Sequence, residues 1–361
     1  MLKKFKVLIL SLNHYQNQQH PRKWFKGVAI LFILTFNLVL VWTMVRYFTT
    51  IPAIGEPYVL VADWPKLPAG VVMGQVSGVD IDSHGNVFVF HRADRVWKGE
   101  DTGLQPIASS TVLVFDGETG KLVRQWGANT FVMPHSLTID SQDNIWLTDV
   151  GKHQIFKFDH MGNLLLSLGE RGKPGNDAMH FNRPTDVAVE KDGSFYVSDG
   201  YGNTRIVKFS PKGRFLAEWG TRGNAPGQFA VPHSLALDRQ GYVYVADRGN
   251  ARLQIFDNTG KFITEWNGTH IGRPWAVRIG VDGSVYVVDG GDQRVLFPDR
   301  ARILKFDAHG NLLASFGSYG KKPGQFIWPH TIAVASNNAI YVGEVGTGMR
   351  LQKFIRTKVN N

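Results

Sequence analysis

Three histidines each follow a proline in a segment that recurs along the chain. They are His135 in PHSLTID, His233 in PHSLALD and His330 in PHTIAV. Neutral imidazoles are common metal ligands, and a site with three of them keeps a fourth coordination position open for water or substrate. Zn²⁺ suits this donor set, and an open site of this kind is typical of catalysis. The three histidines therefore predict a catalytic zinc site, provided that the fold brings them together.

Two arginines and a tyrosine are the other candidates for chemistry. Arg92, Tyr201 and Arg248 each follow a short apolar run that ends in His or Asp. Arginine offers fork-like donors for a carboxylate, and a tyrosine beside a metal cation can act as a base. Three further arginines are better explained as structural. In three copies of the repeat an Arg lies a few residues after an Asp, which predicts an ion pair within each of these copies. The three arginines are Arg205, Arg252 and Arg294.

All these residues belong to a repeat that has six copies. Each copy contains short segments in which apolar and polar residues alternate, as in SFYVSD and YVYVAD, separated by turns rich in Gly, Asn and Asp. Four short antiparallel strands that recur about every 40 to 55 residues are typical of a propeller blade. The sequence therefore predicts an all-β, six-bladed β-propeller rather than an open solenoid, which would need capping repeats. The copies begin at Ser77, Pro134, Pro184, Pro232, Pro274 and Pro329.

The propeller explains how the three histidines can meet. The first strand of each blade lines the central channel, and alternate blades of six lie about 120° apart. Side chains at one position of blades 2, 4 and 6 therefore point at a single spot on the axis. A role for Pro-His in starting the strand is the alternative. In chain order this position holds Ser77, His135, Thr185, His233, Trp275 and His330.

The two ends of the repeat region are predicted to pair with each other. The last copy lacks an obvious fourth strand, and the apolar segment Tyr58–Ala62 precedes the first copy. If this segment joins the last blade, the ring closes and no sheet edge stays exposed. We therefore expect a linker with a ring-closing strand at 47–76 and the propeller at 77–361.

The distribution of charge argues against a nucleic-acid partner. The chain has a net charge of +10, but seven basic residues and no acidic ones lie within residues 1–46. The remaining residues carry 33 basic against 30 acidic side chains, a nearly neutral balance. Cysteine is absent, which excludes disulfides, thiolate metal sites and cysteine nucleophiles.

The N-terminal region predicts a membrane anchor. Gly27–Val45 is a run of 19 residues without a charge, close to the roughly 20 that a membrane-spanning helix needs. Six basic residues precede it and only Arg46 follows it closely, which predicts a cytoplasmic N-terminus and an extracytoplasmic propeller. We expect a basic cytoplasmic tail at 1–26 and a single-pass anchor in the cell membrane at 27–46. A cleaved signal peptide is the alternative.

Several longer motifs resemble one enzyme family. The residues Val76–Phe354 are similar to the peptidyl-α-hydroxyglycine α-amidating lyases, the second catalytic domain of peptidylglycine α-amidating monooxygenase. The resemblance implies a six-bladed propeller of NHL-type repeats. The motifs that carry it are VSGVDID, FHRADRVW, MPHSLTID, LTDVGKHQIFKF, RPTDVAV, VSDGYGNTRIVKFSPKGRF, PGQFAVPHSLALD, VADRGNARLQ and WPHTIAV.

The resemblance implies a reaction and a role for each site residue. Family members cleave a peptidyl-α-hydroxyglycine to a peptide amide and glyoxylate. By resemblance, His135, His233 and His330 bind the catalytic zinc, Tyr201 is the base, and Arg92 and Arg248 bind or polarise the substrate.

The resemblance also implies a structural calcium, and the sequence departs from the family around it. The calcium would be held by the backbone carbonyls of Val79 and Leu137 and by an aspartate at a position where this chain has Thr331. Trp328 stands where the family has methionine, and Gly202 where it has cysteine.

Two other functions stay open at this point. A non-enzymatic NHL-type propeller would bind a peptide or an envelope component through one face, without metal. A propeller lactonase or other hydrolase would hold calcium with Asp, Glu and Asn near the axis, where the first strands of this chain begin with His, Ser, Thr and Trp.

Overall fold

The computed structural model describes residues 58–97, 102–268, 270–292 and 300–357. The chain divides into two compact units, Met1–Ala53 and Ile54–Asn361, and the described residues belong to the second. The basic tail and the membrane anchor predicted at 1–26 and 27–46 lie outside them. Among the residues that are described, no helix is long and apolar enough to cross a membrane.

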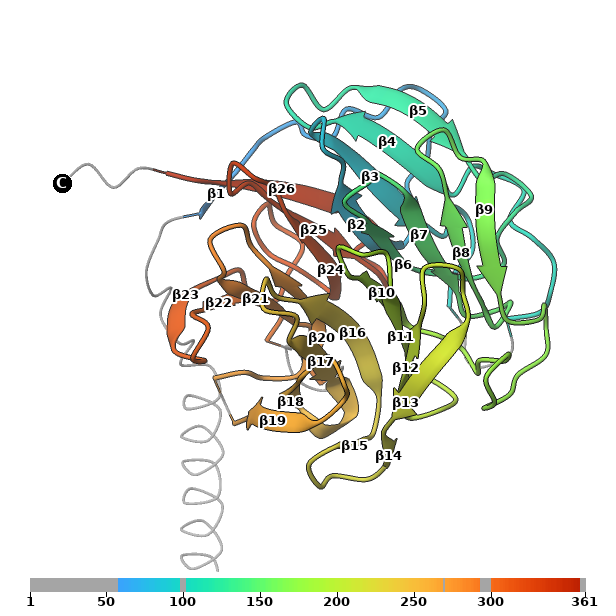
Figure 1. Ribbon diagram of the computed structural model, residues 1–361. Coiled ribbons are helices and arrows are strands. Elements are labelled where there is room, and N and C mark those ends of the chain that lie inside the picture. Colours follow the sequence, from blue (N-terminus) through green and yellow to red (C-terminus); the bar gives the residue numbers. More distant parts are fainter. Residues whose placement is uncertain (1–57, 98–101, 269, 293–299, 358–361) are drawn as a thin grey trace, which may run out of the picture. The chain divides into compact units, whose positions relative to one another are not determined.

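Six antiparallel sheets of four strands each form a closed ring, so the predicted six-bladed propeller is confirmed (Figure 1). Blade 1 contains β2 (Val76–Ile81), β3 (Asn86–His91), β4 (Val112–Asp116) and β5 (Leu122–Trp126). Blade 2 contains β6 (Pro134–Ile139), β7 (Ile145–Asp149), β8 (Gln154–Phe158) and β9 (Leu164–Leu168). Blade 3 contains β10 (Asp186–Val189), β11 (Phe195–Asp199), β12 (Arg205–Phe209) and β13 (Phe215–Trp219).

The second half of the ring repeats this arrangement. Blade 4 contains β16 (Pro232–Leu237), β17 (Val243–Asp247), β18 (Arg252–Phe256) and β19 (Phe262–Trp266). Blade 5 contains β20 (Pro274–Ile279), β21 (Val285–Asp289), β22 (Arg302–Phe306) and β23 (Leu312–Phe316). Blade 6 contains β24 (Pro329–Val334), β25 (Ile340–Glu344), β26 (Leu351–Arg356) and β1 (Tyr58–Leu60). Two short parallel strands, β14 (Thr221–Arg222) and β15 (Gln228–Phe229), lie between blades 3 and 4. A 3-10 turn, η2 (Arg248–Asn250), connects the second and third strands of blade 4.

Apolar side chains fill the space between neighbouring blades. The second strand of blade 2, IWLTD, is buried throughout, whereas its fourth strand, LLLSL, is largely exposed. Trp146 of blade 2 packs on Phe195 of blade 3, with ring centres 4.5 Å apart. Each blade therefore depends on both neighbours to cover its faces.

The strand β1 completes the last blade, which is the role predicted for this segment. It pairs with β26 so that Tyr58 opposes Arg356 and Leu60 opposes Phe354. The Tyr58 ring stacks on Phe316 of blade 5, with ring centres 4.7 Å apart. The strand ends at Leu60, two residues before the end predicted from the sequence. Chain segments from opposite ends of the propeller thus join in one sheet.

A buried acid ends the second strand of five blades and fixes the loop before the first strand. In blade 2 the Asp149 carboxylate accepts hydrogen bonds from the backbone N–H groups of Val132 (2.6 Å) and Met133 (3.0 Å), which directly precede Pro134. Because the first and second strands are antiparallel, the end of one lies beside the start of the other. The five acids are Asp149, Asp199, Asp247, Asp289 and Glu344.

Four of these acids each form an ion pair with an arginine of their own blade, which lies on the third strand or in the loop before it. The ion pairs predicted for Arg205 and Arg252 are present, at 3.1 Å and 3.0 Å. Arg294 lies outside the described residues, and within them Arg300 and Arg302 bind the acid of blade 5. The four pairs are Arg205 with Asp199, Arg252 with Asp247, Arg302 with Asp289 and Arg350 with Glu344.

The two faces of β1 allow a test of ring closure. Leu60 packs against the apolar cluster between blades 5 and 6, whereas Val59 is 47% exposed. We expect Leu60→Asp to lower the free energy of unfolding by about 2 kcal/mol or more, because it places a charge against apolar side chains. Val59→Asp should change it by less than about 0.5 kcal/mol. Urea unfolding measures both, and equal effects would contradict the role given to β1.

Candidate metal centre and substrate cavity

A β-bulge near the start of the inner strand turns each of the three histidines away from the regular pairing. In blade 2 the register shifts between Pro134 and Ser136, so His135 has no partner residue on the second strand. The same shift occurs at His233 and at His330. Bulges re-aim single side chains and are frequent beside functional sites.

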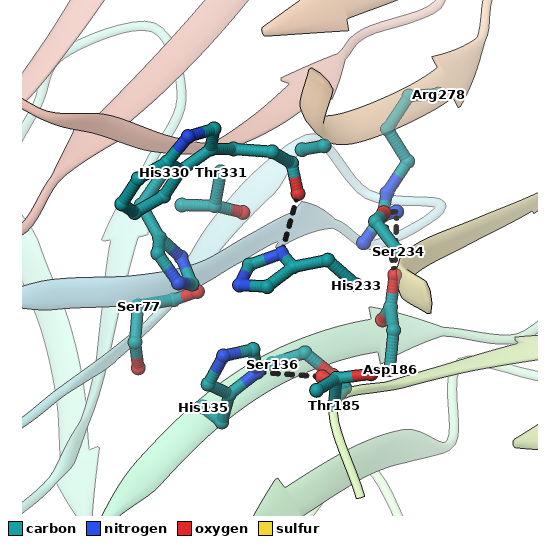
Figure 2. A pocket seen from close by; sticks show the side chains of 12 residues that line it. Ser77, His135, Ser136, Thr185, Asp186, His233, Ser234, Arg278, His330 and Thr331 are labelled. Atoms are coloured by element: carbon teal, nitrogen blue, oxygen red, sulfur yellow. Dashed lines mark hydrogen bonds and ion pairs between the residues drawn. The ribbon is translucent and has the colours of Figure 1, made fainter. Parts of the chain in front are cut away.

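The three predicted ligands lie together at the centre of the ring (Figure 2). The centres of the His135, His233 and His330 rings are 4.8, 4.9 and 5.0 Å apart. One ring nitrogen of each histidine lies within 4.8 Å of those of the other two. All three residues are buried. The alternation of histidines in the sequence thus corresponds to a cluster in space.

The Nδ1 atom of each histidine is hydrogen-bonded to the next blade in the ring. The acceptor is always the backbone carbonyl of the residue at the equivalent position, in blades 3, 5 and 1. A carbonyl only accepts, so Nδ1 carries the ring proton and Nε2 keeps a free lone pair. The pairs are His135 with Thr185 (2.6 Å), His233 with Trp275 (2.6 Å) and His330 with Ser77 (2.9 Å).

The Nε2 lone pairs outnumber the protons available to them. The Tyr201 hydroxyl lies 3.0 Å from Nε2 of His135 and 2.9 Å from Nε2 of His233, yet it has a single proton to donate. Nε2 of His330 is buried without a hydrogen-bond partner among the described residues. Buried polar atoms without partners are unfavourable, and a cation between the rings would engage all three. The donor set therefore fits a metal ion.

Burial keeps the three imidazoles in the neutral form that binds metal. Removal from water, with the nearby charge of Arg92, lowers the pKa of His135 to about 3. Burial, then the charge of Arg248, lowers the pKa of His233 well below its usual value. Burial lowers the pKa of His330 in the same way. At neutral pH no proton has to be displaced from Nε2 before a metal binds.

Tyr201 and Arg248 lie beside the histidines, on loops that follow the second strands of blades 3 and 4. Nη1 of Arg248 donates a hydrogen bond to the Tyr201 hydroxyl at 3.3 Å. The Arg248 guanidinium also lies over the Trp275 ring, 4.1 Å from its centre. Both residues are partly exposed, so a ligand at the metal would meet a hydroxyl group and a cation together.

Arg92 reaches the same place from blade 1. Its Nε donates to the Pro134 carbonyl at 2.9 Å and its Nη1 to Oε1 of Gln75 at 2.6 Å. Among the described residues, Nη2 has no such partner and can bind a ligand. Burial lowers the pKa of Arg92 to about 10, so the side chain stays charged at neutral pH. Its guanidinium also lies 5.1 Å from the centre of the Trp97 ring.

His91 holds the loop that carries Arg92. Its Nδ1 accepts hydrogen bonds from the backbone N–H groups of Gly74 (3.3 Å) and Ala93 (3.0 Å). The two segments touch so closely that a Cβ at Gly74 would lie 1.8 Å from the Ala93 carbonyl oxygen. Burial lowers the pKa of His91 to about 4, so its ring is a neutral acceptor at pH 7.

A cavity of about 590 Å³ opens beside His330. All three residues predicted to act on substrate line it, together with Trp97, Trp275 and Trp328. Trp97 is not among the residues that the sequence predicts for the site, because a tryptophan in one loop of one blade is not part of the repeat. The cavity therefore combines two cations with an aromatic wall.

The position that the resemblance gives to calcium does not fit that ion. The carbonyl oxygen of Leu137 lies 3.5 Å from Nη2 of Arg278, and Val79 is buried on the neighbouring strand β2. Thr331 offers a hydroxyl in place of a carboxylate. Calcium binds about six to eight oxygens, carboxylates among them, and a guanidinium at the same carbonyl competes with it.

A second group of possible ligands belongs to a turn. Asp82 and His84 lie in the turn between β2 and β3 of blade 1, close to His160 in the turn between β8 and β9 of blade 2. The Asp82 carboxylate already accepts hydrogen bonds from the Asn86 amide (2.8 Å) and from Nε2 of His160 (2.9 Å). We interpret these contacts as structural, because they hold the turn of blade 1 and join it to the neighbouring turn of blade 2.

The NHL repeat family matches residues 131–158, 181–209 and 229–256, which lie in blades 2, 3 and 4. The solved structure of a streptogramin B lyase has a similar fold, with a TM-score of 0.55 over 83% of this chain and 98% of that one. The sequence identity is 13%, so this likeness concerns the fold alone.

Two curated relatives are similar in sequence. Peptidyl-glycine alpha-amidating monooxygenase B of Xenopus laevis is 40% identical over 304 residues, which cover 78% of this chain and 34% of that protein. Probable peptidyl-alpha-hydroxyglycine alpha-amidating lyase pgal-1 of Caenorhabditis elegans is 35% identical over 303 residues, which cover 76% of this chain and 80% of that protein. The chain spans about a third of the length of the frog and rat relatives that it matches.

The lowered pKa of His91 predicts a loss of stability in acid. Between pH 6.5 and pH 4 the unfolded imidazole takes up a proton while the folded one does not, so the free energy of unfolding falls as the pH falls. The loss approaches about 3 kcal/mol near pH 4. His91→Gln cannot titrate there and should lose less between pH 7 and pH 4.5, as measured by urea unfolding.

His309→Gln, at an exposed turn, is the matched control and should keep the pH dependence of the native chain. A native pH dependence in His91→Gln would contradict the assignment.

Proposed function

We propose that this chain, which belongs to the peptidyl-α-hydroxyglycine α-amidating lyase family, is a zinc-dependent lyase that cleaves the C–N bond of a peptidyl-α-hydroxyglycine. Family membership rests on the 35% identity to the nematode protein over four fifths of its length. One observation supports the catalytic part most strongly. Three neutral, buried imidazoles direct Nε2 lone pairs to one point beside a cavity that contains Tyr201 and two arginines.

The metal would be held by His135, His233 and His330. A zinc ion bound there would supply a Lewis acid for a substrate oxygen. The hydrogen bonds from Nδ1 to backbone carbonyls orient the rings and raise their basicity as ligands.

Tyr201 is the group best placed to move the proton in this reaction. Its hydroxyl is within 3.0 Å of two of the three Nε2 atoms, and Arg248 donates a hydrogen bond to it, which stabilises negative charge on the phenol oxygen. In its phenolate form, Tyr201 takes the proton of the α-hydroxyl group as the C=O bond of glyoxylate forms. The electron pair of the C–N bond passes to the amide nitrogen, which takes up that proton from Tyr201, so the products are a peptide amide and glyoxylate and the phenolate is restored.

Arg92 and Arg248 are the residues that would bind the α-carboxylate of the substrate. Both are cations on the wall of the cavity, and Arg92 keeps Nη2 available while its other nitrogens are hydrogen-bonded. Guanidinium groups bind carboxylates with paired donors. We propose that the aromatic wall formed by Trp97, Trp275 and Trp328 contacts the residue before the hydroxyglycine.

The sequence supports a location for the reaction. We propose that residues 27–46 anchor the chain in the cell membrane and that the propeller faces the extracytoplasmic side. The support is the basic charge of residues 1–26 beside a long uncharged run.

Zinc content and glyoxylate release together test the proposed activity. We expect the full-length chain to bind one zinc ion and to release glyoxylate from an N-acyl-α-hydroxyglycine. His135→Ala and His233→Ala should each lose most of the zinc and at least about 100-fold in kcat/KM, because two ligands hold the ion poorly. Exposed His309→Ala should behave as the native chain. Full activity in His135→Ala would contradict the proposal, and a zinc-free, inactive native chain would favour a binding propeller.

Tyr201→Phe separates proton transfer from metal binding. We expect kcat to fall by about 100-fold or more while the zinc content and KM change little, because only the hydroxyl group is lost. Tyr242→Phe, at an exposed position away from the cavity, should leave kcat unchanged. Native kcat in Tyr201→Phe would exclude this residue as the base.

A further inference from the structure

A charged arginine lies inside the ring, below the histidines. Arg278 is on β20, three residues after Trp275, and its side chain is 14% exposed. It borders a water-sized space of about 10 Å³ that also touches the three histidines. It borders as well a separate cavity of about 200 Å³ that includes Asp80 and Thr138. Its guanidinium therefore stands between the metal centre and the rest of the channel.

The guanidinium of Arg278 is hydrogen-bonded to residues of four blades, and Figure 2 shows it beside two of them, Asp186 and Ser234. The two protons of Nη1 are shared among four acceptors: Asp186 in blade 3, the Ser234 hydroxyl and the Leu235 carbonyl in blade 4, and the Val277 carbonyl in blade 5. Nη2 donates to the carbonyl of Leu137 in blade 2. The distances to Asp186, Ser234, Leu235, Val277 and Leu137 are 3.1, 3.2, 3.2, 2.9 and 3.5 Å.

Two acids from other blades face this cation. Asp186 is buried and also accepts hydrogen bonds from the Ser234 hydroxyl (2.7 Å) and the Leu235 N–H (3.0 Å). Asp80 of blade 1 accepts one from the N–H of Ile139 (2.8 Å) and interacts electrostatically with Arg278. Burial acts to lower the pKa of Arg278, but the charges of Asp186 and Asp80 outweigh it and raise the pKa. The group is a permanent cation.

We propose that Arg278 is a built-in axial cation that takes the place of a structural calcium ion, so the chain binds a single metal ion, at the histidines. The guanidinium already donates to the Leu137 carbonyl, one of the oxygens a calcium ion would need. Thr331 brings no carboxylate to this position, and Asp186 already forms an ion pair with the guanidinium at 3.1 Å. The inference does not depend on the lyase activity.

Arg278 is also a positioning residue for the metal centre. Asp186 directly follows Thr185, whose carbonyl binds Nδ1 of His135. Ser234 directly follows His233, and Trp275, on the same strand as Arg278, supplies the carbonyl for Nδ1 of His233. One guanidinium thus joins the inner strands that hold two of the three ligands.

Calcium content and melting temperature of the native chain give the first test. The full-length chain, purified in calcium-free buffer with zinc present, should contain no calcium. Its melting temperature should be the same with calcium chloride as with magnesium chloride at equal concentration. One calcium ion per chain, or a rise in melting temperature specific to calcium, would overturn the proposal. Neither readout requires activity, so failure of the proposed lyase function would be seen separately.

Variants of Arg278 give the second test. Arg278→Met leaves two acids without their cation and should lower the melting temperature by roughly 5 to 10 °C and weaken zinc binding. Arg278→Lys keeps the charge but not the planar fork and should lose less. Arg214→Met, at an exposed position, is the control and should melt as the native chain does. Native stability and zinc affinity in Arg278→Met would overturn the proposal.

The double variant Arg278→Met, Thr331→Asp introduces the carboxylate that the family has at this position. It also removes the guanidinium that donates to the Leu137 carbonyl. We expect calcium to raise its melting temperature by several degrees, while Thr331→Asp alone shows no such response because the guanidinium is still in place. A calcium response in Thr331→Asp alone would show that the guanidinium does not occupy the cation position. If the double variant does not fold, the calcium content of the native chain decides the question.

Discussion

The hydrogen bond from each histidine to the backbone of the next blade is the interaction on which the site depends. It sets the tautomer, aims Nε2 at the axis and couples blade 2 to blade 3, blade 4 to blade 5 and blade 6 to blade 1. The last of these bonds, from His330 to Ser77, crosses the junction where the ring closes. The pairing of β1 with β26 therefore supports the third metal ligand as well as the fold. An open ring would leave His330 without its orienting partner.

Charge is arranged in layers along the axis of the propeller. Arg92 and Arg248 lie at the cavity, the neutral histidines lie beneath them, and Arg278 with Asp186 and Asp80 lies deeper. The arginines on the cavity side help to keep the imidazoles unprotonated and offer a site to an anionic substrate. Asp186 forms an ion pair with the buried guanidinium, which is the cation of the inner end of the channel in our proposal. Between these layers, Nε2 of His330 is buried without a hydrogen-bond partner among the described residues, beside the two other histidines that could share a metal ion with it.

The repeat allowed much of this site to be predicted from the sequence. The position of His135, His233 and His330 in alternate blades is a property of the repeat, and symmetry then places them together. The carbonyl acceptors are backbone atoms, which no side-chain pattern reveals. Arg278 was missed because its partner Asp186 is at a different position of another blade, so the pair does not recur. Trp97 lies in one irregular loop, and the predicted anchor at 27–46 stays a prediction, outside the described residues.

X-ray absorption at the zinc edge tests the central claim most directly, because it reports the ligands of the ion and not only its presence. For the full-length chain loaded with one zinc ion, the account predicts three imidazole nitrogens at about 2.0 to 2.1 Å and one further light ligand. In His233→Ala the imidazole contribution should fall, with loss of zinc. A spectrum without histidine scattering, or one that His233→Ala leaves unchanged, would contradict the account.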